Sequence, residues 1–90
     1  MNQLYHNDIY KFNSPVKSYW EDTCSDIKES FREINSNSKS NIVVIGAGYT
    51  GLSCAIQLVK KYNEEVTVIE AGHIGWGSSA RNAGFCCIPP

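Results

Sequence analysis

The sequence predicts an α/β fold, in which an N-terminal amphipathic helix precedes a βαβ unit. Three observations predict it. Residues 41–45, NIVVI, are a short β-branched run that leads directly into glycines spaced G-x-G-x-x-G. Apolar residues then recur at helical spacing, and a second β-rich run, VTVIE, follows. Strand, glycine turn, helix and strand in this order are typical of a βαβ unit.

The composition fits one small domain or a piece of a larger one. The chain has 90 residues and a net charge of -1, so it offers no basic field for nucleic acid and no polybasic surface for anionic lipid. Its longest apolar run, residues 42–45, is far shorter than the ~20 residues that a membrane-spanning helix needs. The polar start, MNQLYHNDIYKFN, lacks the apolar core of a signal peptide, so we expect a cytoplasmic protein.

The cysteines and histidines form no metal-binding pattern. Cys24, Cys54, Cys86 and Cys87 contain no C-x-x-C pair, and neither histidine lies at ligand spacing from them. In a chain without an export signal we expect reduced thiols and no metal site. Cys54 falls inside the predicted helix and is expected to be a small buried residue. Adjacency alone is weak evidence for redox activity at Cys86 and Cys87.

The first helix is predicted from an apolar stripe within residues 18–34. Five residues recur there at steps of three or four: Trp20, Cys24, Ile27, Phe31 and Ile34. This spacing is typical of an amphipathic helix, which we expect to dock on a larger body. The polar stretch NSNSKSN after it marks a boundary. Residues 1–40 are therefore predicted to be an arm, docking helix and linker, and residues 41–90 an incomplete cofactor-binding domain.

The βαβ unit follows that boundary. The run at residues 41–45 suits a parallel strand buried on both faces. Residues 50–62 carry one helical face, formed by Leu52, Ala55, Ile56 and Val59. Lys60 and Lys61 fall in the last turn, where cations favour the negative end of the helix dipole. A polar turn at residues 63–65 then leads to the second strand.

Each glycine of the G-x-G-x-x-G motif has its own mechanical task. Gly46 lets the chain leave the strand in a tight turn, with backbone angles that a side chain would forbid. Gly48 removes a side chain where a pyrophosphate must approach the backbone. Gly51 lets the helix pack closely on the strands. The helix N-terminus then offers unpaired N–H groups and a partial positive charge to phosphates.

The second strand ends in Glu70, nineteen residues beyond Gly51. A carboxylate at this place can accept hydrogen bonds from the adenosine ribose hydroxyls. It would also repel a 2′-phosphate, which disfavours an NADP-type ligand. Together with its strand and helix, the motif predicts dinucleotide binding but does not by itself separate FAD from NAD.

The segment after Glu70, AGHIGWGSSARNAGF, is rich in glycine and small residues. A plain NAD-binding domain usually proceeds from the acid toward another helix and strand, so this loop argues against NAD. The sequence resembles the FAD-dependent oxidoreductases of the D-amino-acid oxidase and glycine oxidase superfamily, most closely the branch related to gamma-glutamylputrescine oxidoreductase. The resemblance lies in VVIGAGYTGLSCAIQL, VIEAG and IGWGSSARNAGF, with SYWEDT upstream.

The resemblance implies a Rossmann-like FAD domain, here a partial one, and a separate β-rich substrate domain. It implies FAD as the cofactor and a site on the matching positions: Gly46, Ala47, Gly48, Tyr49, Thr50, Gly51, Glu70, Ala71, Ser78, Ser79, Arg81 and Asn82. Arginine suits phosphate charge or the negative potential of a reduced flavin. The chain departs from the family at Ala80 and Ala83, where glycine is frequent, and at the two adjacent cysteines, where polar residues are usual.

The resemblance also implies a function. We expect the chain to be the N-terminal FAD-binding portion of an oxidoreductase that oxidises a small-molecule amine or amino acid by hydride transfer to flavin. No catalytic residue is identifiable in it, and we expect this portion alone to be inactive, because two strands and one crossover helix bury little apolar surface. Two alternatives stay open: a stand-alone dinucleotide-binding module without catalysis, and a non-functional truncated remnant.

Overall fold

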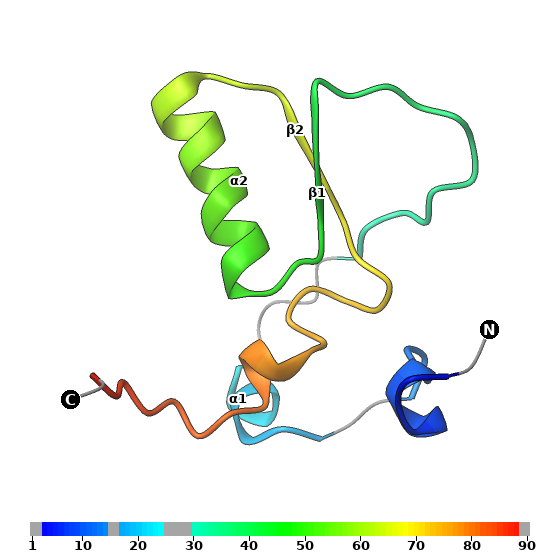
Figure 1. The fold of residues 1–90 in the computed structure, drawn as a ribbon, viewed down its shortest axis with the longest axis vertical. Helices are drawn as coiled ribbons and strands as arrows, with labels where there is room; N and C mark the ends of the chain where they lie inside the picture. The colour runs from blue at the N-terminus through cyan, green and yellow to red at the C-terminus, as the bar shows by residue number, and fades with distance from the viewer. Residues whose placement is uncertain (1–2, 15–16, 25–29, 89–90) are drawn as a thin grey trace.

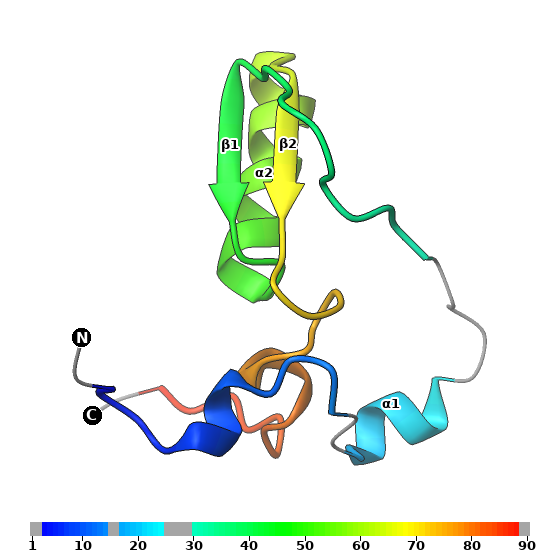
Figure 2. The same cartoon turned by 90° about the vertical axis from the view of Figure 1, so that its right-hand side faces the viewer.

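The computed structural model describes residues 3–14, 17–24 and 30–88. Its elements in chain order are the 3-10 helix η1 (Asn7–Tyr10), α1 (Tyr19–Thr23), β1 (Ile42–Ile45), α2 (Tyr49–Tyr62), β2 (Val66–Ile69) and the 3-10 helix η2 (Ser78–Ala80). Figures 1 and 2 show α2 lying along the two strands. The described residues between 3 and 24 and the loop after β2 gather beyond the carboxyl ends of both strands, whereas residues 30–41 lead back to the start of β1.

The sheet has two parallel strands, with Ile42 opposite Val66 and Ile45 opposite Ile69. Parallel neighbours require a crossover connection, and α2 supplies it. The predicted α/β unit with a small parallel sheet is therefore confirmed. No helix in the described ranges is long and apolar enough to cross a membrane.

Helix α2 ends at Tyr62 and is capped by Asn63. Asn63 adopts a left-handed conformation with φ 55°, which asparagine tolerates better than most residues. Its N–H donates to the carbonyl of Val59 at 3.1 Å, and the N–H of Glu64 donates to the carbonyl of Leu58 at 3.2 Å. These two bonds satisfy carbonyls that the helix end would leave unpaired. Lys60 and Lys61 lie in the last turn, as predicted.

The apolar face of α2 is narrower than predicted. Ala55 is buried, and Leu52 and Leu58 are partly buried beside it, whereas Ile56 and Val59 are half-exposed. The prediction therefore missed Leu58 and overestimated the burial of Ile56 and Val59. A two-stranded sheet is narrow, so it covers only a narrow stripe of a helix that lies on it.

Cys54 is exposed, so its predicted burial is wrong. It precedes the buried Ala55 by one residue, and one step along a helix turns a side chain away from the covered stripe. Cys24, Cys86 and Cys87 are exposed and free as well.

The prediction of a strand buried on both faces is also wrong. Ile42 and Val44 are partly buried, whereas Val43 is 50% and Ile45 is 84% exposed. Side chains alternate along a strand, so α2 covers one face of β1 and leaves the other face open. The described residues place no element over that second face.

The predicted long amphipathic helix is not formed in the described residues. Helix α1 is a single turn, and residues 30–34 are irregular, with Phe31 and Ile34 exposed; Ile27 lies outside the described residues. A helix draws most of its stability from packing of its apolar face, and the described residues of this stripe after Trp20 are exposed. The Thr23 hydroxyl also donates to the carbonyl of Tyr19 at 2.9 Å, within the last turn of α1.

Candidate functional site

The glycine turn connects β1 to α2. Gly46 has φ +101°, a conformation that side chains rarely adopt, and its N–H donates to the carbonyl of Ile69 at 2.8 Å. A Cβ on Gly51 would overlap the carbonyl oxygen of Gly46 and would lie 3.3 Å from a methyl group of Val44. Both glycines are thus required by local geometry, and the close packing of α2 on β1 depends on Gly51.

Gly48 lies against the loop that follows β2. A Cβ built on Gly48 would be 2.9 Å from the Oγ of Ser79. That hydroxyl oxygen accepts a hydrogen bond from the backbone N–H of Tyr49 at 3.0 Å. The bare backbone at Gly48 therefore makes room for a side chain of this same chain, a contact that sequence reasoning missed. Its role in admitting a pyrophosphate stays a prediction.

The first turn of α2 presents backbone donors near this contact. Ala47, which is buried, uses its N–H for Glu70, and Tyr49 uses its N–H for Ser79. Within the described part of the chain, the N–H groups of Thr50 and Gly51 have no hydrogen-bond acceptor. Free N–H groups and the positive end of the helix dipole together favour an anion.

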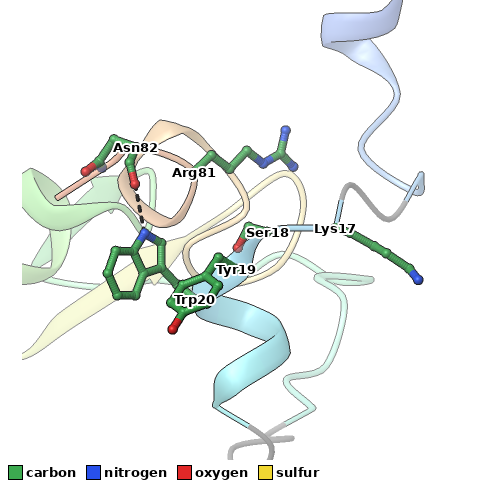
Figure 3. Close-up of a pocket in the computed structure, with 6 residues that line it drawn as sticks. All are labelled: Lys17, Ser18, Tyr19, Trp20, Arg81 and Asn82. Atoms are coloured by element: carbon green, nitrogen blue, oxygen red, sulfur yellow. Dashed lines mark hydrogen bonds between the residues drawn. The ribbon is translucent and has the colours of Figure 1, made fainter.

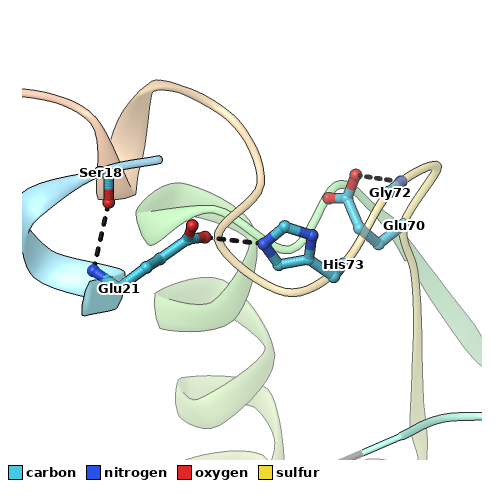
Figure 4. Close-up of polar contacts among 5 residues, drawn as sticks. All are labelled: Ser18, Glu21, Glu70, Gly72 and His73. Carbon is cyan, nitrogen blue, oxygen red and sulfur yellow. Dashed lines mark hydrogen bonds and ion pairs between the residues drawn. The ribbon is translucent and has the colours of Figure 1, made fainter. Parts of the chain in front are cut away.

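Glu70 ties the end of β2 to the glycine turn. Its Oε2 accepts from the N–H of Ala47 at 2.7 Å. Its Oε1 accepts from the N–H of Gly72 at 3.1 Å, as Figure 4 shows. The Ala47 N–H, opposed by partial burial and aided by the N–H groups of Gly72 and Ala71, lowers the pKa of Glu70 below its ordinary value. The carboxylate is therefore ionised at neutral pH. Its contact to a ribose stays a prediction.

Asn82 closes the loop upon itself. Its Nδ2 donates to the carbonyls of Ser78 at 2.9 Å and Ser79 at 3.1 Å. Its Oδ1 accepts from the N–H of Gly84 at 2.8 Å. This side chain, which the sequence predicted as a cofactor contact, thus shapes the loop that presents Ser79. Ser78 lies at the start of η2 and contributes its carbonyl to the same closure.

Arg81 is partly buried and stacks on an aromatic ring. Its guanidinium carbon lies 4.3 Å from the centre of the Trp76 ring, within the range of a cation–π interaction. Its Nε is buried, and no acceptor for it occurs among the described residues. Arg81 is therefore not a solvated surface charge. Sequence reasoning did not single out Trp76; an aromatic residue within a loop of small residues was the available signal.

These parts meet at one end of the sheet. The glycine turn, Glu70 and residues 78–82 all lie beyond the carboxyl ends of the parallel strands, the usual place for ligands in open α/β sheets (Figure 2). The described residues contain no group of three or more His, Cys, Asp or Glu side chains that could hold a metal ion. Free N–H donors and an unpaired guanidinium nitrogen match an anionic dinucleotide, so the residues fit that group.

An α/β unit with this site is typical of dinucleotide-binding proteins. Residues 41–88 match the family described as FAD dependent oxidoreductase. That match covers more than half of the chain, so the chain belongs to this family of oxidoreductases, whose cofactor is FAD. The resemblance and the cofactor predicted from the sequence are confirmed.

The chain is similar to several curated relatives. It is 43% identical over 54 residues to gamma-glutamylputrescine oxidoreductase of Escherichia coli (strain K12), covering 60% of this chain and 12% of that protein. Proteins called probable oxidoreductase OrdL are 32% identical over 75 residues in Haemophilus influenzae and 37% identical over 71 residues in Rhizobium meliloti. These two matches cover 83% and 79% of this chain and 17% and 16% of the relatives. The chain thus spans less than a fifth of their length, and no solved structure matches it.

Proposed function

We propose that this chain is the N-terminal FAD-binding portion of an oxidoreductase that oxidises an amine or amino acid by hydride transfer to flavin. The observation that supports it best is the convergence of the glycine turn, Glu70 and residues 78–82 in a member of an FAD-dependent family. The name of the Escherichia coli relative supports the substrate class, because it specifies an oxidoreductase of a putrescine derivative, which is an amine.

In this proposal the chain binds and orients the cofactor. The N–H groups of Thr50 and Gly51 donate to the pyrophosphate, and Glu70 accepts from the adenosine ribose. Arg81 supplies positive charge from the loop, with its Nε as the free donor. The remaining proposed contacts are Gly46, Ala47, Gly48, Tyr49, Ala71, Ser78, Ser79 and Asn82. FAD, when bound, supplies the redox chemistry.

The proposed domain boundaries are those predicted from the sequence. We propose that residues 1–40 are an accessory segment, that residues 41–90 belong to a Rossmann-like FAD domain, and that the residues that read the substrate lie outside this chain. The substrate is a small molecule, and the cellular location is the cytoplasm.

The decisive experiment uses the natural protein purified from its source under native conditions. Its visible spectrum should show flavin absorption, or should acquire it when FAD is added to stripped protein. Anaerobic addition of a panel of amines and amino acids, including gamma-glutamylputrescine, should bleach the oxidised flavin. Absence of FAD binding would contradict the proposal. Binding without bleaching by any member of the panel would favour the stand-alone dinucleotide-binding module.

A further inference from the structure

The N-terminal arm, here residues 3–24 as far as they are described, lies against the cofactor loop, here residues 72–84. Trp20 on α1 makes the first contact. Its indole Nε1 donates to the backbone carbonyl of Asn82 at 2.8 Å, across 62 residues of sequence (Figure 3). A carbon of the same indole lies 3.4 Å from the place that a Cβ on Gly84 would take. Trp20 thus holds the residue whose side chain closes the loop.

Glu21 makes the second contact, at the other end of the cofactor loop. Its Oε1 lies 2.7 Å from the Nε2 of His73, which follows Glu70 by three residues (Figure 4). Glu21 is only partly exposed. Its own N–H donates at 3.2 Å to the hydroxyl of Ser18, a buried residue that caps α1. The carboxylate is therefore presented by a capped turn.

A third contact comes from the segment before α1. The rings of Phe12 and Trp76 lie 5.0 Å apart between centres, at an angle of 55°, which is a favourable aromatic geometry. Trp76 is also the ring on which Arg81 stacks. The arm therefore contacts the cofactor loop near its start, in its middle and near its end.

The cofactor loop in turn forms hydrogen bonds with the glycine turn and the start of α2. The N–H of Gly75 donates to the carbonyl of Ala47 at 3.0 Å, and the Oγ of Ser79 accepts from the N–H of Tyr49. Contacts thus run without a break from α1 through the loop to the first turn of α2.

The N-terminal arm lies outside the part of the chain that matches the FAD-dependent family. The family match begins at residue 41. A match of 75 residues within a 90-residue chain, as found for the Haemophilus influenzae relative, necessarily includes residues 16–75 and so includes α1. Similarity to that relative therefore extends to the segment that contacts the cofactor loop.

We propose that the N-terminal arm holds the cofactor loop in its FAD-binding position, with Trp20 and Glu21 as the positioning residues. The link to FAD rests on the proposed function. The coupling of arm to loop does not need the cofactor and can be measured without it.

The test compares two conservative variants with two matched controls in the full-length protein. Trp20→Phe keeps a ring but removes the indole donor, and Glu21→Gln keeps the shape but removes the charge. Phe31→Leu changes an exposed aromatic residue elsewhere in the N-terminal segment, and Asp22→Asn changes the acid next to Glu21. Backbone amide exchange without FAD reports the loop, and titration with FAD reports affinity.

We expect amide exchange in residues 72–84 to become several-fold faster in Trp20→Phe and Glu21→Gln, while exchange in α2 and in both controls stays as in the wild type. FAD affinity should fall by a few-fold to roughly tenfold, the scale of one net hydrogen bond. Unchanged loop exchange, or faster exchange throughout α2 as well, would overturn the positioning role. A wild-type protein that binds no FAD would instead overturn the proposed function and the arm's link to the cofactor.

Discussion

The hydroxyl of Ser79 accepts the backbone N–H of Tyr49 at 3.0 Å, joining the loop after β2 to the first turn of α2 across 30 residues. The same hydroxyl is 2.9 Å from the place that a Cβ on Gly48 would occupy. The middle glycine of the motif thus serves loop closure as well as its predicted approach to a pyrophosphate. The Tyr49 N–H is thus engaged by the loop, and the proposed phosphate donors at this helix end are the N–H groups of Thr50 and Gly51.

Gly48→Ala should open the cofactor loop and weaken FAD binding at least tenfold. The added methyl group needs space that the Ser79 hydroxyl fills, and closure of the loop presents Arg81 and Ser79 to the ligand. Titration with FAD measures the loss. Gly77→Ala is the matched control, since a Cβ on Gly77 meets nothing within 4 Å. Equal FAD affinity in the two variants would refute the shared role of Gly48.

Gly51→Ala should destabilise the βαβ unit by about 1–3 kcal/mol, the scale of overpacking in a filled interior. Its Cβ would overlap the carbonyl oxygen of Gly46, which belongs to the backbone and cannot rotate away. Urea unfolding followed by circular dichroism gives the change in free energy. Cys54→Ala on the exposed side of the same helix should stay within about 0.5 kcal/mol of the wild type. A Gly51→Ala variant as stable as that control would contradict the packing described.

Glu70 should make the free energy of unfolding depend on pH. Because the N–H of Ala47 lowers the pKa of Glu70 in the folded protein below its ordinary value, the carboxylate stabilises the fold at pH values above that ordinary pKa. This contribution is lost as the pH falls through the lowered folded pKa. The difference in unfolding free energy between wild type and Glu70→Gln should therefore shrink on acidification. Glu64→Gln, in the exposed turn, is the control, and a difference independent of pH would contradict the account.

Asn63 sets the end of α2 through its left-handed backbone. Asn63→Ala should cost about 1 kcal/mol, because a Cβ disfavours φ 55° and alanine lacks the local polar compensation of asparagine. Asn63→Gly should be at least as stable as the wild type. Thermal unfolding of both variants, beside Glu65→Ala in the same turn, measures the effect. Equal stability of the alanine and glycine variants would show that the cap does not depend on this conformation.

The sequence alone determined those features that depend on neighbouring residues. The β-branched runs became β1 and β2, the helical spacing became α2, and Lys60 and Lys61 fell in its last turn. The glycine motif placed the tight turn at Gly46 and the close helix packing at Gly51. Together with the small-residue loop after Glu70, the motif also indicated the family and FAD, which the match of residues 41–88 confirmed. Periodicity and motif spacing predict these features because strands, helices and tight turns depend mainly on residues close together in the sequence.

Tertiary structure decided what each side chain contacts. The stripe from Trp20 to Ile34 has helical spacing, yet its described residues form a single helical turn, where Trp20 donates to the carbonyl of Asn82, 62 residues away. Ile45 stays exposed because α2 covers one face of β1. Glu70 and Ser79 bind backbone of the glycine turn and of α2. Such contacts depend on which distant segments meet in space, and periodicity along the chain does not record that.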